Sequence, residues 1–176
     1  YISNVKENTK ELARVLMDYG YKLCTDGTDN HLILMDLRNK KITGSKIEYI
    51  LEKINISVNK NTIIGDKNAF SPGGIRIGLC AMTTRGIRKK DCFELARLIN
   101  DTIQCAINLQ EEGLQALRHH RGGLAEQGGT PRLEASGRRM DINLFKEKVD
   151  TELQNSQGKL SSLKEDVYQF TKGLSF

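Results

Sequence analysis

The sequence predicts an α/β fold in which a small, mostly antiparallel sheet is covered by helices. Segments with apolar residues at helical spacing alternate along the chain with short apolar runs bounded by turn residues. The predicted strands are too few and too closely spaced for a doubly wound parallel sheet, which needs long crossover connections. At 176 residues, the chain is long enough for one domain with a hydrophobic core.

The N-terminal half supplies a helix, a hairpin and a second helix. Apolar residues recur at helical spacing over 5–19, and a glycine follows as a stop signal. Residues 21–25 and 31–37 predict two strands, and the polar turn between them favours a hairpin. Thr43 is a candidate N-cap for a helix whose apolar residues lie on one face over 47–54.

The chain from residue 56 onward supplies two more strands and three helices. The strands are expected over 56–58 and 74–81, and residues 59–61 form a polar segment at the end of the first. The helices, predicted from apolar residues at helical spacing, are expected over 89–109, 142–153 and 160–174.

Residues 111–140 differ in composition from the chain on either side. From 113 to 139 there is no lysine and no aromatic residue, and paired glycines are expected to break a regular helix. We therefore expect a flexible, Gly/Arg-rich insertion over 111–140 that divides the domain into residues 1–110 and C-terminal helices within 141–176. Two adjacent histidines in it lack a third candidate ligand and do not predict a metal site.

The charge balance does not favour nucleic acid as a partner. The net charge of +5 comes from lysines and arginines spread among acids, and the chain has no tryptophan for base stacking. No apolar run is long enough to span a bilayer. The first residue is not methionine and no signal-peptide pattern follows it, so we expect a fragment or a processed chain.

The cysteines predict neither zinc nor disulfides. No two of them form a C-x-x-C pair, which makes a zinc site unexpected. Two are expected in strands and two in a helix, so we expect buried free thiols in a reducing compartment. They are Cys24, Cys80, Cys92 and Cys105.

The stretch Ser71–Gly78 is the most informative in the chain. A Pro-Gly-Gly turn, whose glycines permit unusual dihedral angles, precedes an arginine set between two isoleucines. In a strand, Ile75 and Ile77 point to one face and Arg76 to the other. Arg76 has two interpretations: it forms a structural ion pair, or it grips a carboxylate with two parallel hydrogen bonds.

Five motifs, in order, resemble one enzyme family. The chain is similar to the C-terminal region of serine hydroxymethyltransferase over residues 1–110 and, more loosely, over 141–176. Five motifs in the same order and spacing are far more specific than any one alone. They are Thr28–Leu34, Val58–Asn61, Gly65–Lys67, Ser71–Gly78 and Met82–Gly86.

The resemblance implies an activity and an architecture. Family members use pyridoxal phosphate to interconvert serine and glycine and pass the one-carbon unit to tetrahydrofolate. They share the fold of aspartate aminotransferase (fold type I), with a large cofactor domain and a smaller C-terminal domain, which this chain resembles. The resemblance also implies a homodimeric or homotetrameric parent in the cytoplasm or, alternatively, in mitochondria.

The resemblance also implies roles for individual residues. Arg76 matches the arginine that binds the substrate carboxylate, and Asn61 matches the asparagine that hydrogen-bonds the folate pterin ring. Lys60 is implied to face the charged tail of folate, the alternative being a solvated lysine. Arg85 and His31 also fall in family motifs, and we expect both to be structural.

The chain departs from the family pattern in one decisive way. The threonine-rich segment ending in His-Lys, which supplies the lysine that forms a Schiff base with the cofactor, is absent from these 176 residues. We therefore expect no catalytic residue in this chain and no activity from it alone. Two alternatives stay open: part of an active transferase, or a catalytically dead stand-alone domain that acts as a binding or regulatory module. A different enzyme of the same fold type would have no use for the Asn61 segment.

Overall fold

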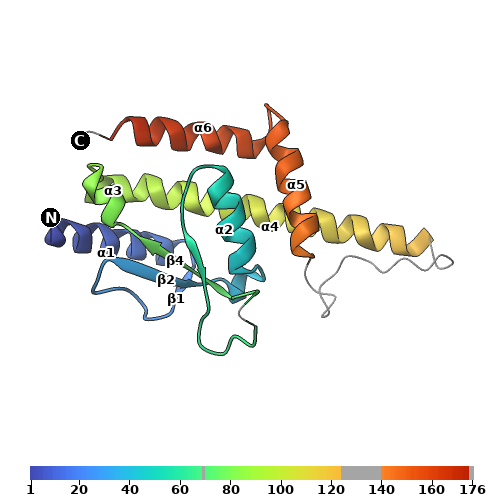
Figure 1. Cartoon of the computed structure of the whole chain (residues 1–176), viewed down its shortest axis with the longest axis horizontal. Helices are drawn as coiled ribbons and strands as arrows, with labels where there is room; N and C mark the ends of the chain where they lie inside the picture. Colours follow the sequence, from blue (N-terminus) through green and yellow to red (C-terminus); the bar gives the residue numbers. More distant parts are fainter. Residues whose placement is uncertain (69, 124–139, 175–176) are drawn as a thin grey trace.

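The computed structural model describes residues 1–68, 70–123 and 140–174, with helices and strands mixed along the chain (Figure 1). The predicted α/β class is confirmed. The helices are α1 (Ile2–Asp18), α2 (Gly44–Lys53), α3 (Cys80–Thr84), α4 (Cys92–Gly123), α5 (Ile142–Gln154) and α6 (Lys159–Lys172), with short 3₁₀ helices η1 (Arg38–Lys40) and η2 (Lys89–Asp91). The strands are β1 (Lys22–Leu23), β2 (Leu32–Asp36), β3 (Asn59–Asn61) and β4 (Gly74–Gly78).

The strands form one antiparallel sheet in the order β1-β2-β4-β3. The predicted hairpin is β1–β2, and β4 lies in the centre of the sheet between β2 and β3. The side chains of Ile33, Met35, Ile75 and Ile77 are buried, which places the core on one face of the sheet. The expected small antiparallel sheet is therefore confirmed.

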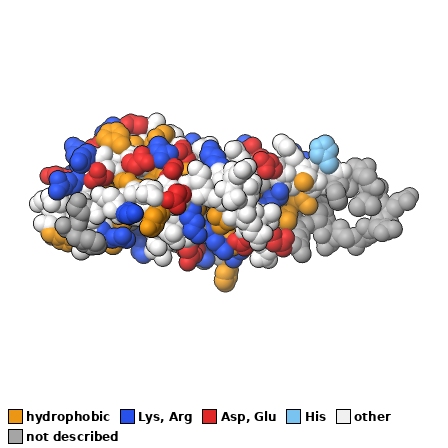
Figure 2. Space-filling model, turned by 90° about the horizontal axis from the view of Figure 1, so that it is seen from above, with side chains coloured by type: hydrophobic (Ala, Val, Ile, Leu, Met, Phe, Trp, Pro, Cys, Tyr) orange, Lys and Arg blue, Asp and Glu red, His pale blue; other side chains and the backbone are white. Residues whose placement is uncertain are grey.

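Helices cover that buried face in layers. Helices α1 and α2 contact both the sheet and α4, and α5 and α6 contact α4 as well. In Figure 1, α4 runs along the length of the molecule, with the sheet below it and α6 above it. In the described part of the chain, no helix is both long and apolar enough to cross a bilayer. Basic and acidic side chains are interspersed over the face drawn in Figure 2.

A buried lysine joins the C-terminal helices to the rest of the fold. The side chain of Lys46 on α2 is fully buried. Its Nζ donates to Gln110 Oε1 on α4 at 2.8 Å and to the carbonyl oxygen of Met140 just before α5. The ring of Phe145 lies 5.8 Å from the same nitrogen. Because a buried cation is costly unless it is hydrogen-bonded, these contacts hold α2, α4 and α5 in one arrangement.

The third strand does not lie where the sequence predicted it. The expected strand over 56–58 is wrong, because the ladder with β4 is formed by the polar residues 59–61. Ile56 and Val58 instead pack, partly buried, against the hydrophobic core. At the edge of a sheet, pairing depends on which backbone meets the neighbouring strand, and side-chain polarity gives little information about it.

The long helix also extends beyond its predicted end. Helix α4 continues to Gly123, so the interruption expected from residue 111 is wrong for 111–123. Most residues there are good helix formers, and Gly113 sits where a Cβ would overlap Met140 Cε. Tertiary packing therefore outweighs the low helix propensity of glycine. The rest of the expected insertion, 124–139, lies outside the described residues.

The cysteine prediction is half right. Cys92 and Cys105 on α4 are buried, and burial raises the pKa of Cys92 to about 12 and that of Cys105 to about 11. Cys24 and Cys80 are exposed: Cys24 follows the last residue of β1, and Cys80 is the first residue of α3 and not part of β4. Those two thiols are therefore not part of the core.

Close backbone contacts fix the start of β4. A Cβ at Gly44 would overlap the carbonyl oxygen of Gly74, and a Cβ at Gly74 would lie 2.8 Å from the carbonyl oxygen of Met35. Neither Gly73 nor Gly74 has a positive φ, so the dihedral freedom expected of this turn is the wrong explanation. The glycines are required because α2, β2 and β4 approach more closely than a side chain allows.

We predict that Gly44→Ala destabilises the fold by about 1–3 kcal/mol, because the new methyl group must displace the Gly74 carbonyl. Urea unfolding of the 176-residue chain measures the effect. Gly78→Ala is the matched control, since the nearest atom to a Cβ there is 3.7 Å away. Equal stability of the two variants would contradict the packing explanation.

Candidate functional site

Arg76 lies on the face of the sheet opposite the core. Its neighbours in β4, Ile75 and Ile77, are buried, whereas Arg76 is exposed, as the alternation of a strand requires. Its cross-strand partners are Leu34 on β2 and Asn59 on β3. The predicted orientation of Arg76 is therefore confirmed, and the strands on both sides limit its movement.

The guanidinium of Arg76 forms no hydrogen bond or ion pair with the residues that the structure describes. The first interpretation of Arg76, a structural ion pair, therefore finds no partner among them. An arginine that has five donors and no partner is suited to bind an anion from outside the chain.

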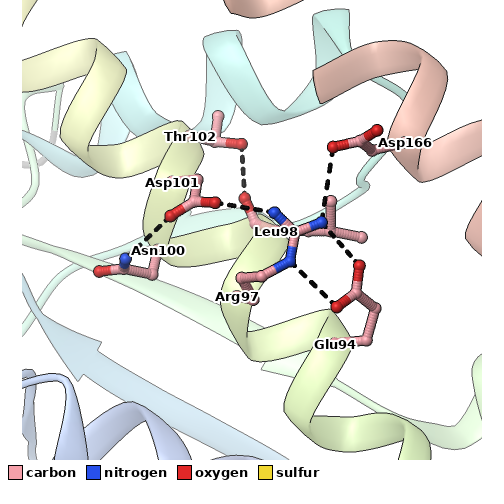
Figure 3. Close-up of polar contacts among 7 residues, drawn as sticks. All are labelled: Glu94, Arg97, Leu98, Asn100, Asp101, Thr102 and Asp166. Atoms are coloured by element: carbon pink, nitrogen blue, oxygen red, sulfur yellow. Dashed lines mark hydrogen bonds and ion pairs between the residues drawn. The ribbon is translucent and has the colours of Figure 1, made fainter. Parts of the chain in front are cut away.

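Arg97 shows what a structural arginine looks like in the same molecule (Figure 3). Along α4, its Nη2 forms an ion pair with Glu94 Oε1 at 2.6 Å and its Nη1 one with Asp101 Oδ2 at 3.0 Å. Nη2 also lies 3.5 Å from Asp166 Oδ2 on α6. These carboxylates raise the pKa of the Arg97 guanidinium, chiefly through the bond to Glu94. Arg97 thus links two helices, whereas Arg76 is bonded to no residue in the described part of the chain.

An open hollow of about 410 Å³ lies around Arg76. Its walls come from the starts of β2 and β3, the end of β4 and the start of α3. Asn59, directly opposite Arg76, belongs to it and was not predicted, although the Asn-Lys-Asn alternation places Asn59 and Asn61 on one face. The lining residues are His31, Leu32, Ser57, Val58, Asn59, Arg76, Gly78, Cys80 and Ala81.

The two residues predicted to contact folate lie on opposite sides of β3. Asn61 pairs with Gly74, so it shares the Arg76 face at a diagonal position. Its Nδ2 donates to the carbonyl oxygen of Thr62 at 2.7 Å, which leaves its amide oxygen without a hydrogen bond among the described residues. The Lys60 side chain points to the opposite face of the sheet, and its Nζ lies 3.5 Å from Glu48 Oε2 on α2. The structure therefore brings Asn61, but not Lys60, to the face of Arg76.

Two residues expected to be structural are exposed. His31, at the start of β2, lines the same hollow as Arg76, and its ring makes no hydrogen bond to described residues. Arg85 follows α3 and lines a different, apolar cavity. We expected His31 to be a hydrogen-bonded structural residue, whereas the structure places it in the lining of the candidate site.

Two carboxylates, the buried Asp36 and the half-buried Asp66, support the loop that leads into β4. Asp36, at the end of β2, accepts hydrogen bonds from Arg38 Nη2 at 2.8 Å and Nε at 3.0 Å, and these bonds lower the pKa of Asp36. Arg38 Nη1 also donates to the carbonyl oxygen of Ile64. Asp66 Oδ2 accepts from the backbone nitrogens of Ile63 and Gly73 at 2.9 and 2.8 Å. These bonds hold the start of β4 and thereby fix the position of Arg76.

Comparison with known proteins identifies the family. A family model described as serine hydroxymethyltransferase matches residues 1–99, more than half of the chain. The chain belongs to the serine hydroxymethyltransferase family. The matched residues contain Arg76, Asn61 and the whole sheet. They also contain Arg38 and its hydrogen-bond partners Asp36 and Ile64.

Individual relatives agree with this assignment. The cytosolic serine hydroxymethyltransferase of Saccharomyces cerevisiae is 45% identical over 111 residues, which are 63% of this chain and 24% of the relative. The mitochondrial serine hydroxymethyltransferase of Candida glabrata is 45% identical over 112 residues, 64% of this chain and 23% of the relative. A probable cytosolic serine hydroxymethyltransferase of Schizosaccharomyces pombe is 45% identical over 112 residues, 64% of this chain and 24% of the relative. The matched part of the chain thus spans about a quarter of the length of these relatives.

We predict that Arg76→Gln changes the free energy of unfolding by less than about 0.5 kcal/mol at pH 7, because no described residue loses a partner. Asp36→Asn is expected to cost about 1–3 kcal/mol, because it removes charged hydrogen bonds to Arg38. Urea unfolding compares the two variants. A large loss in Arg76→Gln would show that Arg76 is structural.

The loss of unfolding free energy caused by Asp36→Asn is also expected to depend on pH. The pKa of Asp36 is lowered in the folded state, so its contribution is present above the unfolded pKa of about 4 and is lost as the pH falls through the folded pKa. The stability difference between wild type and Asp36→Asn should therefore shrink below about pH 4. A difference that stays constant down to pH 2 would contradict this origin.

Proposed function

We propose that this chain is the C-terminal small domain of a serine hydroxymethyltransferase and supplies the arginine that binds the substrate carboxylate. The observation that carries the proposal is the guanidinium of Arg76, which is unpaired among the described residues, extends from a central strand and lines an open hollow. The membership of the chain in the family supports it, because serine and glycine each carry an α-carboxylate.

The carboxylate contact serves orientation as well as affinity. Two parallel hydrogen bonds from a guanidinium fix the plane of a carboxylate, and the strand holds the backbone from which the Arg76 side chain extends. Fixing the carboxylate also fixes which bonds at the substrate Cα face the reacting group. Arg76 is therefore proposed to position substrate rather than to transfer protons.

The cofactor of the proposed enzyme must be held elsewhere. When bound, pyridoxal phosphate, which this family uses, takes up the electron pair of the bond that breaks at the substrate Cα. The hollow around Arg76 is lined by no lysine among its described residues, so it does not fit the attachment of this cofactor. We propose that the lysine and the phosphate-binding groups lie in a large domain outside these 176 residues, and that the chain alone is inactive.

Asn61 is proposed to contact tetrahydrofolate. Its position on the Arg76 face, with its amide oxygen free, suits the donor and acceptor groups of a pterin edge. Lys60 must break its ion pair with Glu48 before it can contact the anionic tail of folate, so the proposed folate contact of Lys60 has less support than that of Asn61. By analogy with the family, the whole protein is proposed to be a homodimer or homotetramer in the cytoplasm or in mitochondria.

The experiment is a chimera. The C-terminal quarter of the Saccharomyces cerevisiae cytosolic relative is replaced by this chain, and conversion of serine to glycine with tetrahydrofolate is measured. We predict an active chimera in which Arg76→Lys lowers kcat/KM for serine about 100-fold or more, because a single ammonium group cannot reproduce the paired geometry. Arg118→Lys, an exposed substitution far along α4, is the matched control.

The folate contact is tested in the same chimera. Asn61→Ala should raise KM for tetrahydrofolate about tenfold, since one hydrogen bond to the pterin ring is lost. It should leave KM for serine nearly unchanged. An active chimera that tolerates Arg76→Lys would contradict the carboxylate role. An inactive but folded chimera would favour the alternative, a catalytically dead binding or regulatory module.

A further inference from the structure

A second cavity lies beside the candidate site and is lined mainly by apolar side chains. It has a volume of about 250 Å³ and is enclosed by residues 55–58, the end of β4 and helices α3, α4 and α6. It shares the wall formed by Ser57, Val58, Gly78 and Ala81 with the Arg76 hollow but extends to the other side of it. Its apolar walls include Ile56, Met82, Leu95, Leu98, Val167 and Phe170.

The charged group at this cavity is Arg85. Its side chain is exposed, so it lies where the cavity meets solvent, and it forms no hydrogen bond or ion pair with the described residues. The lining contains no aspartate or glutamate among the described residues. The hydroxyl of Thr171 is already used, since it donates to the carbonyl oxygen of Val167 at 2.9 Å. The cavity therefore offers mainly apolar walls that also contain the polar side chains of Asn55 and Ser57. Among the described residues, Arg85 supplies one unpaired positive charge at its edge.

We propose that this cavity binds a small monocarboxylate with a flexible apolar chain, its carboxylate on Arg85 and its chain among the walls from α3, α4 and α6. An apolar cavity of about 150 Å³ is large enough to bind benzene, so a space of 250 Å³ accommodates a chain of several methylene groups. The chemistry differs from that of the Arg76 hollow, whose lining carries Asn59 and His31, neither of which lines this cavity. The proposal does not depend on the proposed enzymatic function.

Titration of the 176-residue chain with octanoate, followed by isothermal calorimetry, tests the proposal. We expect saturable binding at one site with Kd on the order of 1 mM or tighter. Octanoate should bind about fifteenfold more tightly than hexanoate, which buries two fewer methylene groups. Arg85→Gln should weaken octanoate binding about three- to tenfold, as expected for a partly exposed ion pair.

Two further variants separate this cavity from other sites. Thr171→Phe, which places a ring at the cavity wall, should abolish binding, whereas Thr151→Phe is the matched control. Thr151 is exposed on α5 and donates a similar hydrogen bond within its own helix, to Glu147. Arg76→Gln should leave octanoate binding unchanged, because Arg76 does not line this cavity.

Three outcomes would overturn the proposal. They are absence of saturable binding, equal affinity for octanoate and hexanoate, and loss of binding in Arg76→Gln but not in Arg85→Gln. Circular dichroism checks that each variant is folded. If Thr171→Phe does not fold, the chain-length dependence and the contrast between the two arginine variants decide the question.

Discussion

The close approach of backbones at Gly44 and Gly74 is the constraint on which the candidate site depends. It brings the N-terminus of α2 against the start of β4, and the nitrogen of Gly44 donates to the carbonyl oxygen of Pro72 at 2.8 Å. The Asp66 carboxylate holds the same turn from the other side. Because the first residue of β4 is fixed and side chains alternate along a strand, the Arg76 side chain faces away from the core.

The charges of this chain divide into those that hold the fold and those left for other partners. Arg38 and Arg97 are bonded to carboxylates, and each also contacts a second segment: Arg38 the carbonyl oxygen of Ile64, and Arg97 the Asp166 carboxylate on α6. Arg76 and Arg85 are bonded to no described residue, and each faces a cavity. Membership in the serine hydroxymethyltransferase family gives the first of these cavities a proposed ligand. The second is assigned from its own chemistry.

Much of the fold could be predicted because it follows from short-range patterns. Helical spacing located every α-helix except α3, whose first residues were wrongly expected in a strand over 74–81, and strand alternation around Arg76 gave its orientation. The register of β3 could not be predicted, because the ladder is formed by polar edge residues 59–61 that carry no alternation of burial. The extension of α4 depends on Met140 packing over Gly113, a contact between distant segments. The placement of Lys60 against Glu48 and of His31 beside Arg76 likewise required the tertiary structure.

The most direct test of the central claim is a crystal structure of the yeast chimera with glycine bound. The account predicts that both carboxylate oxygens of glycine accept hydrogen bonds from the Arg76 guanidinium, on the outer face of β4, with Asn59 beside them. A structure in which Arg76 is paired with a protein carboxylate, while another residue holds the glycine carboxylate, would contradict it.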